Sequence, residues 1–511
     1  MKFKPLILTL AAMTSASHSA FAADAPLWGN GLGRNMVSEE KNLPDTFDPG
    51  KYKQNTEDVD MATTKNIKWA AKLGSQAYGN PTVAGGKIFI GTNNETPRDP
   101  KNLGDKGVVM CFDEKTGKFL WQLAIPKLGT GKVSDWEFLG ICSPPQVEGN
   151  RAYLVTNRCE VLCIDVEGMT NGNDGPYKDE GKYLAEKGKP PFETGPQDGD
   201  IIWRLDMRDE VGVFPHNITS SAILIVGDKL FVTTSNGQDW SHINIPAPNA
   251  PALICVDKNT GALLGEEASG ISQKLFHANW SSPSYAEIGG KGQVVFGGGD
   301  GFAYGFDPTP IAGPDDFKIF KEIWKYDAVP PSYRMKDGKP IKYPAPEGPS
   351  EIISTPVIYK DRAYIAIGQD PEHGDGIGSM SCVDISKTGN ITQSGKIWTY
   401  NKITRTISTP SIINDLVFIS DYAGNIHCVD ANTGKDYWIH NSGSHIWGST
   451  LVADGKLYVG NEDGDFFVME AGKEKKILHK AVFPAPVYST PIAANNTLFV
   501  ATPTHLYAIA K

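Results

Sequence analysis

Short apolar segments separated by turn residues recur along nearly the whole chain of 511 residues. Each unit begins with small residues and often a proline, followed by an apolar strand, a Gly/Asn/Asp turn and a second apolar strand. Eight starts follow this pattern: Gly79-Asn80-Pro81, Cys142-Ser143-Pro144, Ser220-Ser221-Ala222, Ser281-Ser282-Pro283, Ser354-Thr355-Pro356, Ser408-Thr409-Pro410, Ser449-Thr450-Leu451 and Ser489-Thr490-Pro491. The last three lie about 40 residues apart, a spacing typical of four-stranded propeller blades.

A second repeated pattern closes the third strand of most units. It is a small residue, an apolar residue and an aspartate, as in Cys428-Val429-Asp430; in four units a Thr-Gly pair follows, and a tryptophan often marks the next strand. The aspartate can accept hydrogen bonds from the turn backbone, and the glycine permits a positive φ. The tryptophans are expected to cover the gap between neighbouring blades. They are Trp121, Trp203, Trp324, Trp398 and Trp438.

The eighth unit ends at Ala510 without a fourth strand, whereas Ile67-Lys68-Trp69 precedes the first unit and has no blade of its own. Pairing this segment with the last blade would close the ring and remove an open sheet edge. The sequence therefore predicts an all-β, eight-bladed β-propeller over residues 62–511. Residues 23–61 are expected to form a leader that packs on the outside.

The small-Ser-Pro starts, the Asp-x-x-Thr-Gly-x-x-x-Trp pattern and the eight units resemble the pyrroloquinoline-quinone-type repeat propellers of the quinoprotein alcohol dehydrogenase-like superfamily. The resemblance covers residues 67–511. It implies one of two functions, because that family includes quinone-dependent dehydrogenases and non-enzymatic scaffolds. The motif identifies the blade and does not by itself imply a bound cofactor.

The amino-terminal residues 1–22 are typical of a secretory signal peptide. Lys2 and Lys4 precede a short apolar run, and Ala20-Phe21-Ala22 supplies a small-x-small cleavage pattern. The predicted location is therefore periplasmic or secreted, with no membrane anchor, since no apolar run is long enough to span a bilayer. The net charge of −10 argues against nucleic acid as a partner.

Five of the seven cysteines occupy one repeated position and are expected to be buried free thiols: Cys111, Cys163, Cys255, Cys382 and Cys428. Cys142 and Cys159 fall at neighbouring positions of one blade, where a disulfide is geometrically allowed. The chain lacks paired cysteine and histidine spacings for zinc, and Glu167–Asp200 does not match a calcium loop. No metal site is predicted.

The ends of the inner strands and the facing turns are expected to place less repetitive polar residues at one end of the ring. Five histidines project there: His216, His242, His277, His373 and His445. The candidate binding residues of this face are Trp280, Trp447, Asn279, His277, Arg158, Asp300 and Asp421. We expect this face to bind a small-molecule ligand or a periplasmic protein, and we predict no particular catalytic residue.

The alternative function is a quinone-dependent dehydrogenase of alcohols or sugars. In that case Trp280 or Trp447 would stack on pyrroloquinoline quinone, and Asp300 or Asp421 would bind calcium or act as the base. The adjacent cysteine pair typical of the alcohol dehydrogenases is absent from the sequence, and so is a Cys-x-x-Cys-His haem motif. These absences favour the binding scaffold.

Overall fold

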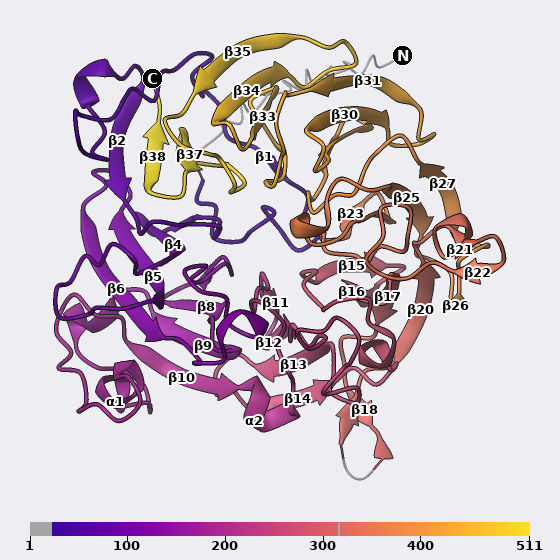
Figure 1. Cartoon of the computed structure of the whole chain (residues 1–511), viewed down its shortest axis with the longest axis horizontal. Coiled ribbons are helices and arrows are strands. Elements are labelled where there is room, and N and C mark those ends of the chain that lie inside the picture. Colours follow the sequence, from indigo (N-terminus) through magenta and orange to yellow (C-terminus); the bar gives the residue numbers. More distant parts are fainter. Residues whose placement is uncertain (1–22, 315–316) are drawn as a thin grey trace, which may run out of the picture.

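The computed structural model describes residues 23–314 and 317–511. Eight four-stranded antiparallel blades surround a central channel, and the strand nearest the channel is β3, β7, β11, β15, β23, β28, β32 or β36 (Figure 1). Blades 1 to 4 comprise β3(Thr82–Ala84), β4(Lys87–Asn93), β5(Lys106–Asp113), β6(Phe119–Pro126); β7(Gln146–Glu148), β8(Arg151–Val155), β9(Glu160–Asp165), β10(Ile201–Asp206); β11(Leu224–Val226), β12(Lys229–Thr233), β13(Leu253–Asp257), β14(Leu263–Glu266); and β15(Ser284–Ile288), β16(Lys291–Gly297), β17(Phe302–Phe306), β20(Glu322–Asp327).

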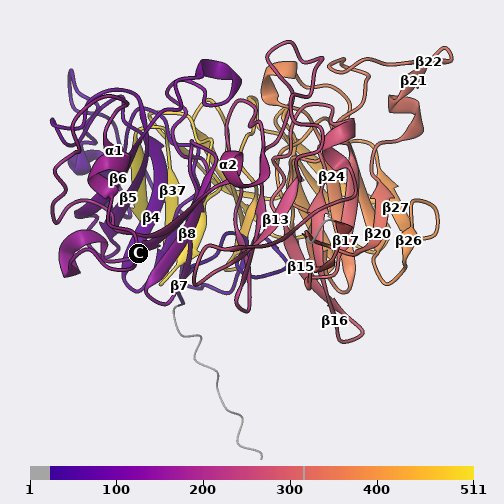
Figure 2. The ribbon, with the colours of Figure 1, turned by 90° about the horizontal axis from the view of Figure 1, so that it is seen from below.

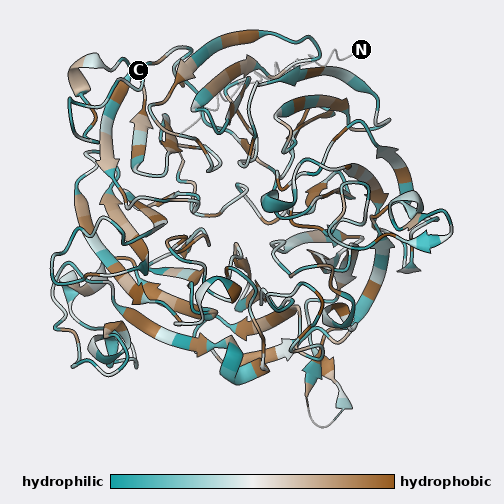
Figure 3. Ribbon diagram, in the orientation of Figure 1, coloured by the Kyte–Doolittle hydropathy of each residue, from teal (hydrophilic) through white to brown (hydrophobic). Residues whose placement is uncertain are grey.

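Blades 5 to 8 comprise β23(Val357–Tyr359), β24(Arg362–Ile367), β25(Ser379–Asp384), β27(Lys396–Tyr400); β28(Ser411–Ile413), β29(Leu416–Ser420), β30(Asn425–Asp430), β31(Asp436–Asn441); β32(Leu451–Ala453), β33(Lys456–Gly460), β34(Asp465–Glu470), β35(Ile477–Val482); and β36(Ile492–Ala494), β37(Thr497–Ala501), β38(His505–Ile509), β2(Ile67–Lys72). The predicted all-β, eight-bladed propeller is thus confirmed. Apolar residues concentrate on the strands, whereas the connecting loops are mostly polar (Figure 3).

Smaller elements decorate the ring. Additional short strands are β1(Val37–Ser38), β18(Ile311–Ala312), β19(Lys318–Ile319), β21(Met335–Lys336), β22(Lys339–Pro340) and β26(Gly389–Asn390). The helices are α1(Glu180–Leu184) and α2(Met207–Val211), with 3-10 turns η1(Met61–Thr63), η2(Gly131–Val133), η3(Gly168–Asn171), η4(Ile271–Lys274), η6(Pro331–Tyr333) and η7(Pro371–His373). Within the described residues, no helix has the length and apolar character needed to cross a membrane.

The two ends of the chain close the ring as the sequence predicts. Strand β2 pairs antiparallel with β38, with Lys72 opposite His505 and Ile67 opposite Ile509. The last blade therefore contains three carboxyl-terminal strands and one amino-terminal strand. The amino-terminal strand also brings Trp69 to the seam with blade 1, where its indole N–H donates to the Glu114 carbonyl at 3.0 Å.

The seam tryptophans join neighbouring blades in a common way. The indole of Trp203 donates to the Lys258 carbonyl of the next blade at 3.1 Å and rests against Gly261 of its Thr-Gly turn. A Cβ built on Gly261 would lie 2.6 Å from that indole, and its φ of +77° also favours glycine. Trp69 on Gly117 and Trp398 on Gly434 repeat this contact. The glycine of this repeated turn therefore allows the tryptophan of the preceding blade to pack closely, in addition to permitting the positive φ of the hairpin.

A second set of contacts links the blades around the channel. Near the inner-strand starts, a backbone N–H of one blade donates to a hydroxyl or amide oxygen of the next: Ala222 to Ser282, Thr355 to Thr409, Thr409 to Ser449, Ser449 to Thr490 and Thr490 to Asn80. These bonds are between 2.6 and 3.1 Å long. They explain why the starts contain Ser, Thr or Asn, whose short side chains can accept across the narrow inner seam.

The predicted outside packing of the leader holds only for its second part: Phe47, for example, contacts His479 of the outer strand β35, with ring centroids 5.6 Å apart. The first part of the leader runs elsewhere. Residues 23–40 cross one end of the channel and contact the inner strand, or residues directly beside it in the sequence, in all eight blades. The contacts include Ala25 with Val83, Pro26 with Val147, Leu32 with Tyr285, Gly33 with Ile358, Asn35 with Ile412, β1 with β32, and Ser38 with Ala493; Arg34 supplies the contacts to blade 3. Figure 1 shows this segment crossing the centre of the ring. The inner strands are edge strands, and the leader forms hydrogen bonds with their free backbone N–H and C=O groups.

Arg34 anchors this crossing segment. Its side chain is only 1 % exposed, and it donates to the carbonyls of Trp28, Ala222, Ile223 and Pro283 at 2.7–3.1 Å. A fifth bond reaches the side-chain oxygen of Gln146 at 3.1 Å. Burial lowers the Arg34 pKa to about 9, so the guanidinium stays protonated at neutral pH. The cation is thus solvated by oxygens from several blades.

Candidate ligand-binding cavity

A cavity of about 500 Å³ occupies the channel at the end opposite the leader's crossing. Every blade contributes a residue from its inner-strand start: Asn80, Cys142, Ser220, Ser282, Thr355, Thr409, Ser449 and Thr490. Trp28 of the leader also lines it. Figure 2 shows the β21–β22 hairpin at this end of the ring and the β15–β16 turn at the other. A concave space of this size suits a small organic molecule.

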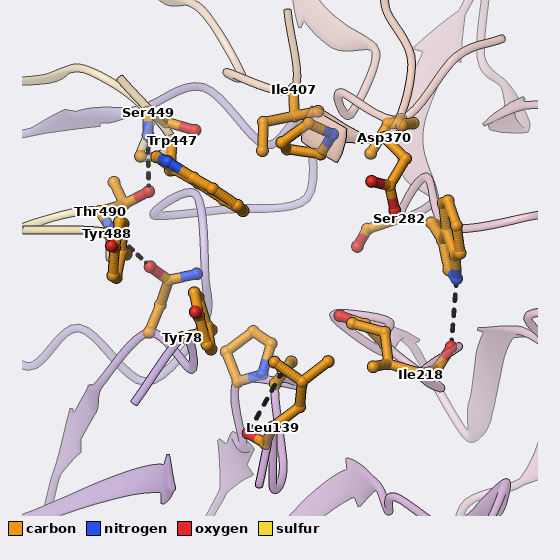
Figure 4. A pocket seen from close by; sticks show the side chains of 18 of the residues that line it. Tyr78, Leu139, Ile218, Ser282, Asp370, Ile407, Trp447, Ser449, Tyr488 and Thr490 are labelled. Carbon is orange, nitrogen blue, oxygen red and sulfur yellow. Dashed lines mark hydrogen bonds between the residues drawn. The ribbon is translucent and has the colours of Figure 1, made fainter. Parts of the chain in front are cut away.

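One wall of the cavity is aromatic. The rings of Tyr78 and Tyr488 are stacked with centroids 5.2 Å apart, and Trp447 meets Tyr488 edge-on, also at 5.2 Å. Glu462 lies behind them, accepting from the Tyr488 hydroxyl at 3.3 Å and from the Trp447 indole at 3.4 Å. Figure 4 shows Tyr78, Tyr488 and Trp447 grouped on one side. The ring faces are held in place by these contacts.

The opposite wall carries Trp280 and acidic groups. The Trp280 indole donates to the Ile218 carbonyl at 3.1 Å, which fixes its plane. Asp370, which Figure 4 shows across the cavity from Trp447, caps η7 by accepting from the Glu372 backbone N–H at 2.9 Å. Burial raises the Asp370 pKa, although that hydrogen bond favours the ionised form.

The charged side chains that line the cavity are all acidic. Its ionisable carboxyl groups are Asp370, Glu372 and Glu137, and the lining residues include no lysine, arginine or histidine. Low-dielectric walls of this kind concentrate a negative potential. The cavity is therefore suited to a cation and unfavourable for an anion.

Two of the seven predicted site residues, Trp280 and Trp447, line the cavity, and the other five do not. Asp300 lies in the β16–β17 turn, accepting from the Tyr304 hydroxyl at 2.6 Å and the Phe302 N–H at 3.1 Å. Asp421 lies in the β29–β30 turn, with its carboxylate 3.0 Å from the His427 ring. Each carboxylate is directed into its own blade because the turn amides and neighbouring side chains bind it there.

His277 and Asn279 lie behind the wall and are buried. The His277 ring meets the Trp280 ring edge-on at 4.9 Å, and the Asn279 side chain bonds the Asn236 carbonyl and the Gly299 N–H. Burial lowers the His216 pKa to about 4 and the His277 pKa well below its ordinary value, which keeps both rings neutral. Four of the five predicted histidines gather here. His445 stands apart, stacked on Tyr422 at 4.3 Å.

Arg158 belongs to a different site. It lines a second cavity of about 500 Å³ beside α1, together with Arg204, Arg208 and several lysines. The buried carboxylate of Glu160 pairs with Arg204 at 2.8 Å and with Arg158 at 3.4 Å. Arg158 is therefore held away from the central channel.

The disulfide allowed by the sequence is not formed. All seven cysteines are free and buried, which confirms the five expected thiols and corrects the Cys142–Cys159 pairing. The Cys142 side chain lines the central cavity. Cys159 instead has a φ of +62° and its thiol bonds the Thr234 carbonyl of the next blade at 3.4 Å. The two thiols therefore have different surroundings, Cys142 near the Leu139 carbonyl and Cys159 at the next blade.

Sequence reasoning missed most of the lining. A sequence signal for the two missed tyrosines did exist. An aromatic residue lies directly before the inner-strand start, or one residue further away, at Tyr78 and Tyr488 as it does at the predicted Trp280 and Trp447. Asp370 and Trp28 gave no such signal, because an irregular loop and the crossing leader place them.

Comparison with known proteins agrees with the blade motif. Residues 423–510 match the family model described as outer membrane protein assembly factor BamB. A crystal structure of BamB from Moraxella catarrhalis covers 86 % of this chain and 98 % of its own at a TM-score of 0.54, with 14 % identity. The carboxyl-terminal blades of this eight-bladed propeller thus match the pyrroloquinoline-quinone-type repeat.

Curated relatives match only short parts of the chain. The quinohemoprotein alcohol dehydrogenase of Comamonas testosteroni is 25 % identical over 23 % of this chain and 19 % of its own length. The outer membrane protein assembly factor BamB of Burkholderia pseudomallei is 30 % identical over 21 % of this chain and 28 % of its own length. The matched segments thus span less than a third of each relative. The names of the two relatives describe two different functions, a dehydrogenase and an assembly factor.

The cavity does not fit pyrroloquinoline quinone. That cofactor carries three carboxylates, whereas the lining offers carboxylates and no cationic side chain. A calcium ion could bridge them only if several protein carboxylates converged. In the part of the chain that the structure describes, no three carboxylates do so. Asp300 and Asp421, the predicted base or calcium ligands, are both committed to other contacts.

Proposed function

We propose that this protein is an exported binding module whose central cavity captures a small organic cation, without redox chemistry. Export is proposed from the amino-terminal sequence, whose residues 1–22 lie outside the described structure. The observation that supports the ligand class is the lining itself. It combines Trp28, Trp136, Trp280, Trp447, Tyr78 and Tyr488 with three carboxyl groups and no positive side chain.

Aromatic faces and carboxylates act together on a cation. A quaternary or primary ammonium over an aromatic ring is attracted by the ring quadrupole, by up to about 2 kcal/mol when water is excluded. Asp370 lies across the cavity from the Trp447, Tyr78 and Tyr488 wall, and it would supply the counter-charge. A ligand between these walls would contact both features at once.

The test compares matched cationic and neutral ligands. Choline and benzyltrimethylammonium are titrated into the protein with tryptophan fluorescence or calorimetry as the readout, against 3,3-dimethylbutanol, the uncharged analogue of choline. We expect the cations to bind at least about tenfold more tightly than the neutral analogue. Equal affinity of the charged and neutral ligands would refute the proposal.

Variants locate the binding. Trp447→Ala is expected to weaken cation binding at least about tenfold, since it removes one ring face of the cavity. Trp240→Ala is the control, because Trp240 is 54 % exposed and does not line the cavity. Tight binding of pyrroloquinoline quinone with calcium, followed by substrate-dependent reduction of an artificial acceptor, would instead support the dehydrogenase.

A further inference from the structure

Behind Trp280, histidines from separate segments converge. His216 precedes blade 3, His242 lies in the β12–β13 loop and His277 precedes blade 4. One nitrogen of each ring lies within 4.8 Å of the others. The ring of His373, on η7, is 5.2 Å from His277 and 5.8 Å from His242.

The hydrogen bonds of the two buried rings direct one nitrogen of each toward the other. His216 Nδ1 lies 2.5 Å from the Gln238 carbonyl, which can only accept, so Nδ1 carries a proton and Nε2 has a free lone pair. His277 Nδ1 is 3.0 Å from the Tyr343 hydroxyl. The two Nε2 atoms lie 2.6 Å apart, and because His216 Nε2 is the acceptor, the proton between them belongs to His277 Nε2. Metal-binding histidines usually have such outer partners on the second nitrogen.

The third histidine is presented by an unusual turn. His242 has a φ of +54°, a conformation that non-glycine residues adopt rarely and at some cost. Asp239 stabilises the turn by accepting from the Ser241 N–H at 3.0 Å and the Asn244 amide at 3.0 Å. The turn brings the His242 ring to 4.7 Å from His277 and 5.1 Å from His216. His373 adds a buried Nδ1 that has no hydrogen-bond partner among the described residues.

We propose that His216, His242 and His277 form a binding site for one divalent transition-metal ion of the zinc or copper class. Neutral imidazoles suit these ions, whereas calcium and magnesium prefer oxygen ligands. When the ion binds, the proton between the two Nε2 atoms moves to His277 Nδ1, which then donates to the Tyr343 hydroxyl oxygen, so both rings stay neutral and both Nε2 lone pairs are free for the ion. Metal–nitrogen distances of about 2.0–2.1 Å in a tetrahedral geometry require those atoms to separate by less than about 1 Å. Three protein ligands leave a fourth position, next to His373.

The primary experiment uses the mature protein without a polyhistidine tag, treated with a chelator and dialysed. Zn²⁺ and Cu²⁺ are titrated by calorimetry, and Co²⁺ is used as an absorbing probe of coordination. We expect one ion per chain, tetrahedral d–d absorption with Co²⁺, and a higher melting temperature in Zn²⁺. Failure of the chelator-treated protein to bind any of the three ions would overturn the proposal.

Two variants and one control assign the ligands. His242→Ala removes a ligand from a loop and is expected to weaken Zn²⁺ binding at least about tenfold and to abolish the Co²⁺ spectrum. Tyr343→Phe removes only the outer partner of His277 and is expected to weaken binding while one ion still binds. His445→Ala, at the same end of the ring, is the control and should bind as the wild type does.

Unchanged affinity and Co²⁺ absorption in His242→Ala would show that the histidines form a hydrogen-bonded cluster only. Circular dichroism verifies the fold of each variant.

Discussion

The two ends of the central channel present the same inner strands but are completed differently. At one end, residues 23–40 bind the exposed backbone groups of every blade, and the Arg34 cation is surrounded by five oxygens of the chain itself. At the other end, the inner-strand starts surround a cavity lined by aromatic and acidic side chains. The comparison shows that the closed end satisfies its polar groups internally, whereas the open end retains groups available to a ligand.

The largest expected effect is at the closed end. Arg34→Ala would leave several buried carbonyls without a donor, and we expect it to lower the free energy of unfolding by about 4 kcal/mol. Urea unfolding, followed by circular dichroism, measures this. Arg208→Ala is the matched control, since Arg208 pairs with Asp206 near the surface and should cost less than about 1 kcal/mol. A small loss for Arg34→Ala would mean that the crossing segment is not a structural closure.

An intermediate effect concerns the two acids that the sequence assigned to the site. Burial raises the Asp300 pKa to about 6, above its value in the unfolded chain. Wild-type stability relative to Asp300→Asn is therefore highest below about pH 4, and falls as the pH rises to about 6, by up to about 3 kcal/mol. Unfolding at a series of pH values measures the difference. The same stability difference at pH 4 and pH 7 would contradict it.

For Asp421→Asn we expect the opposite pH dependence of the stability difference from the wild type. Burial raises the Asp421 pKa, but hydrogen bonds and charge from His427 outweigh burial, so the pKa is lowered overall. The carboxylate thus stabilises the fold above the pKa of the unfolded chain, and this contribution disappears as the pH falls through the lowered pKa. Neither variant should change ligand affinity at neutral pH, because neither side chain lines the cavity.

The smallest effect on stability is expected at the open end. Trp447 is half-buried, its ring contacts Tyr78, Tyr422 and Tyr488, and its indole makes one long hydrogen bond of 3.4 Å to Glu462. Trp447→Ala should lower the free energy of unfolding by about 1 kcal/mol, against about 3 kcal/mol for Trp438→Ala at a blade seam. Thermal and urea unfolding of both variants measures this. Equal losses would show that Trp447 is a structural residue rather than a ligand contact.

The repeated motif made the ring predictable because its residues act locally or between adjacent repeats. Asp430, for example, accepts from the Thr433 N–H at 2.9 Å, and Trp438 donates to Gly472 of the next blade. The unpaired Ile67 segment likewise identified the closure. Such contacts depend on spacing within one or two units, which the sequence displays directly.

The sequence by itself determined the blades, their number, the closure between the two termini and the face that carries the less repetitive residues. Only the tertiary structure decided where the leader runs, that Asp300 and Asp421 point away from the channel, and that His216, His242 and His277 meet. Those outcomes depend on the directions of side chains on loops from different blades. The loops are positioned by contacts between residues that are far apart in the sequence, and the repeat pattern carries no information about such contacts.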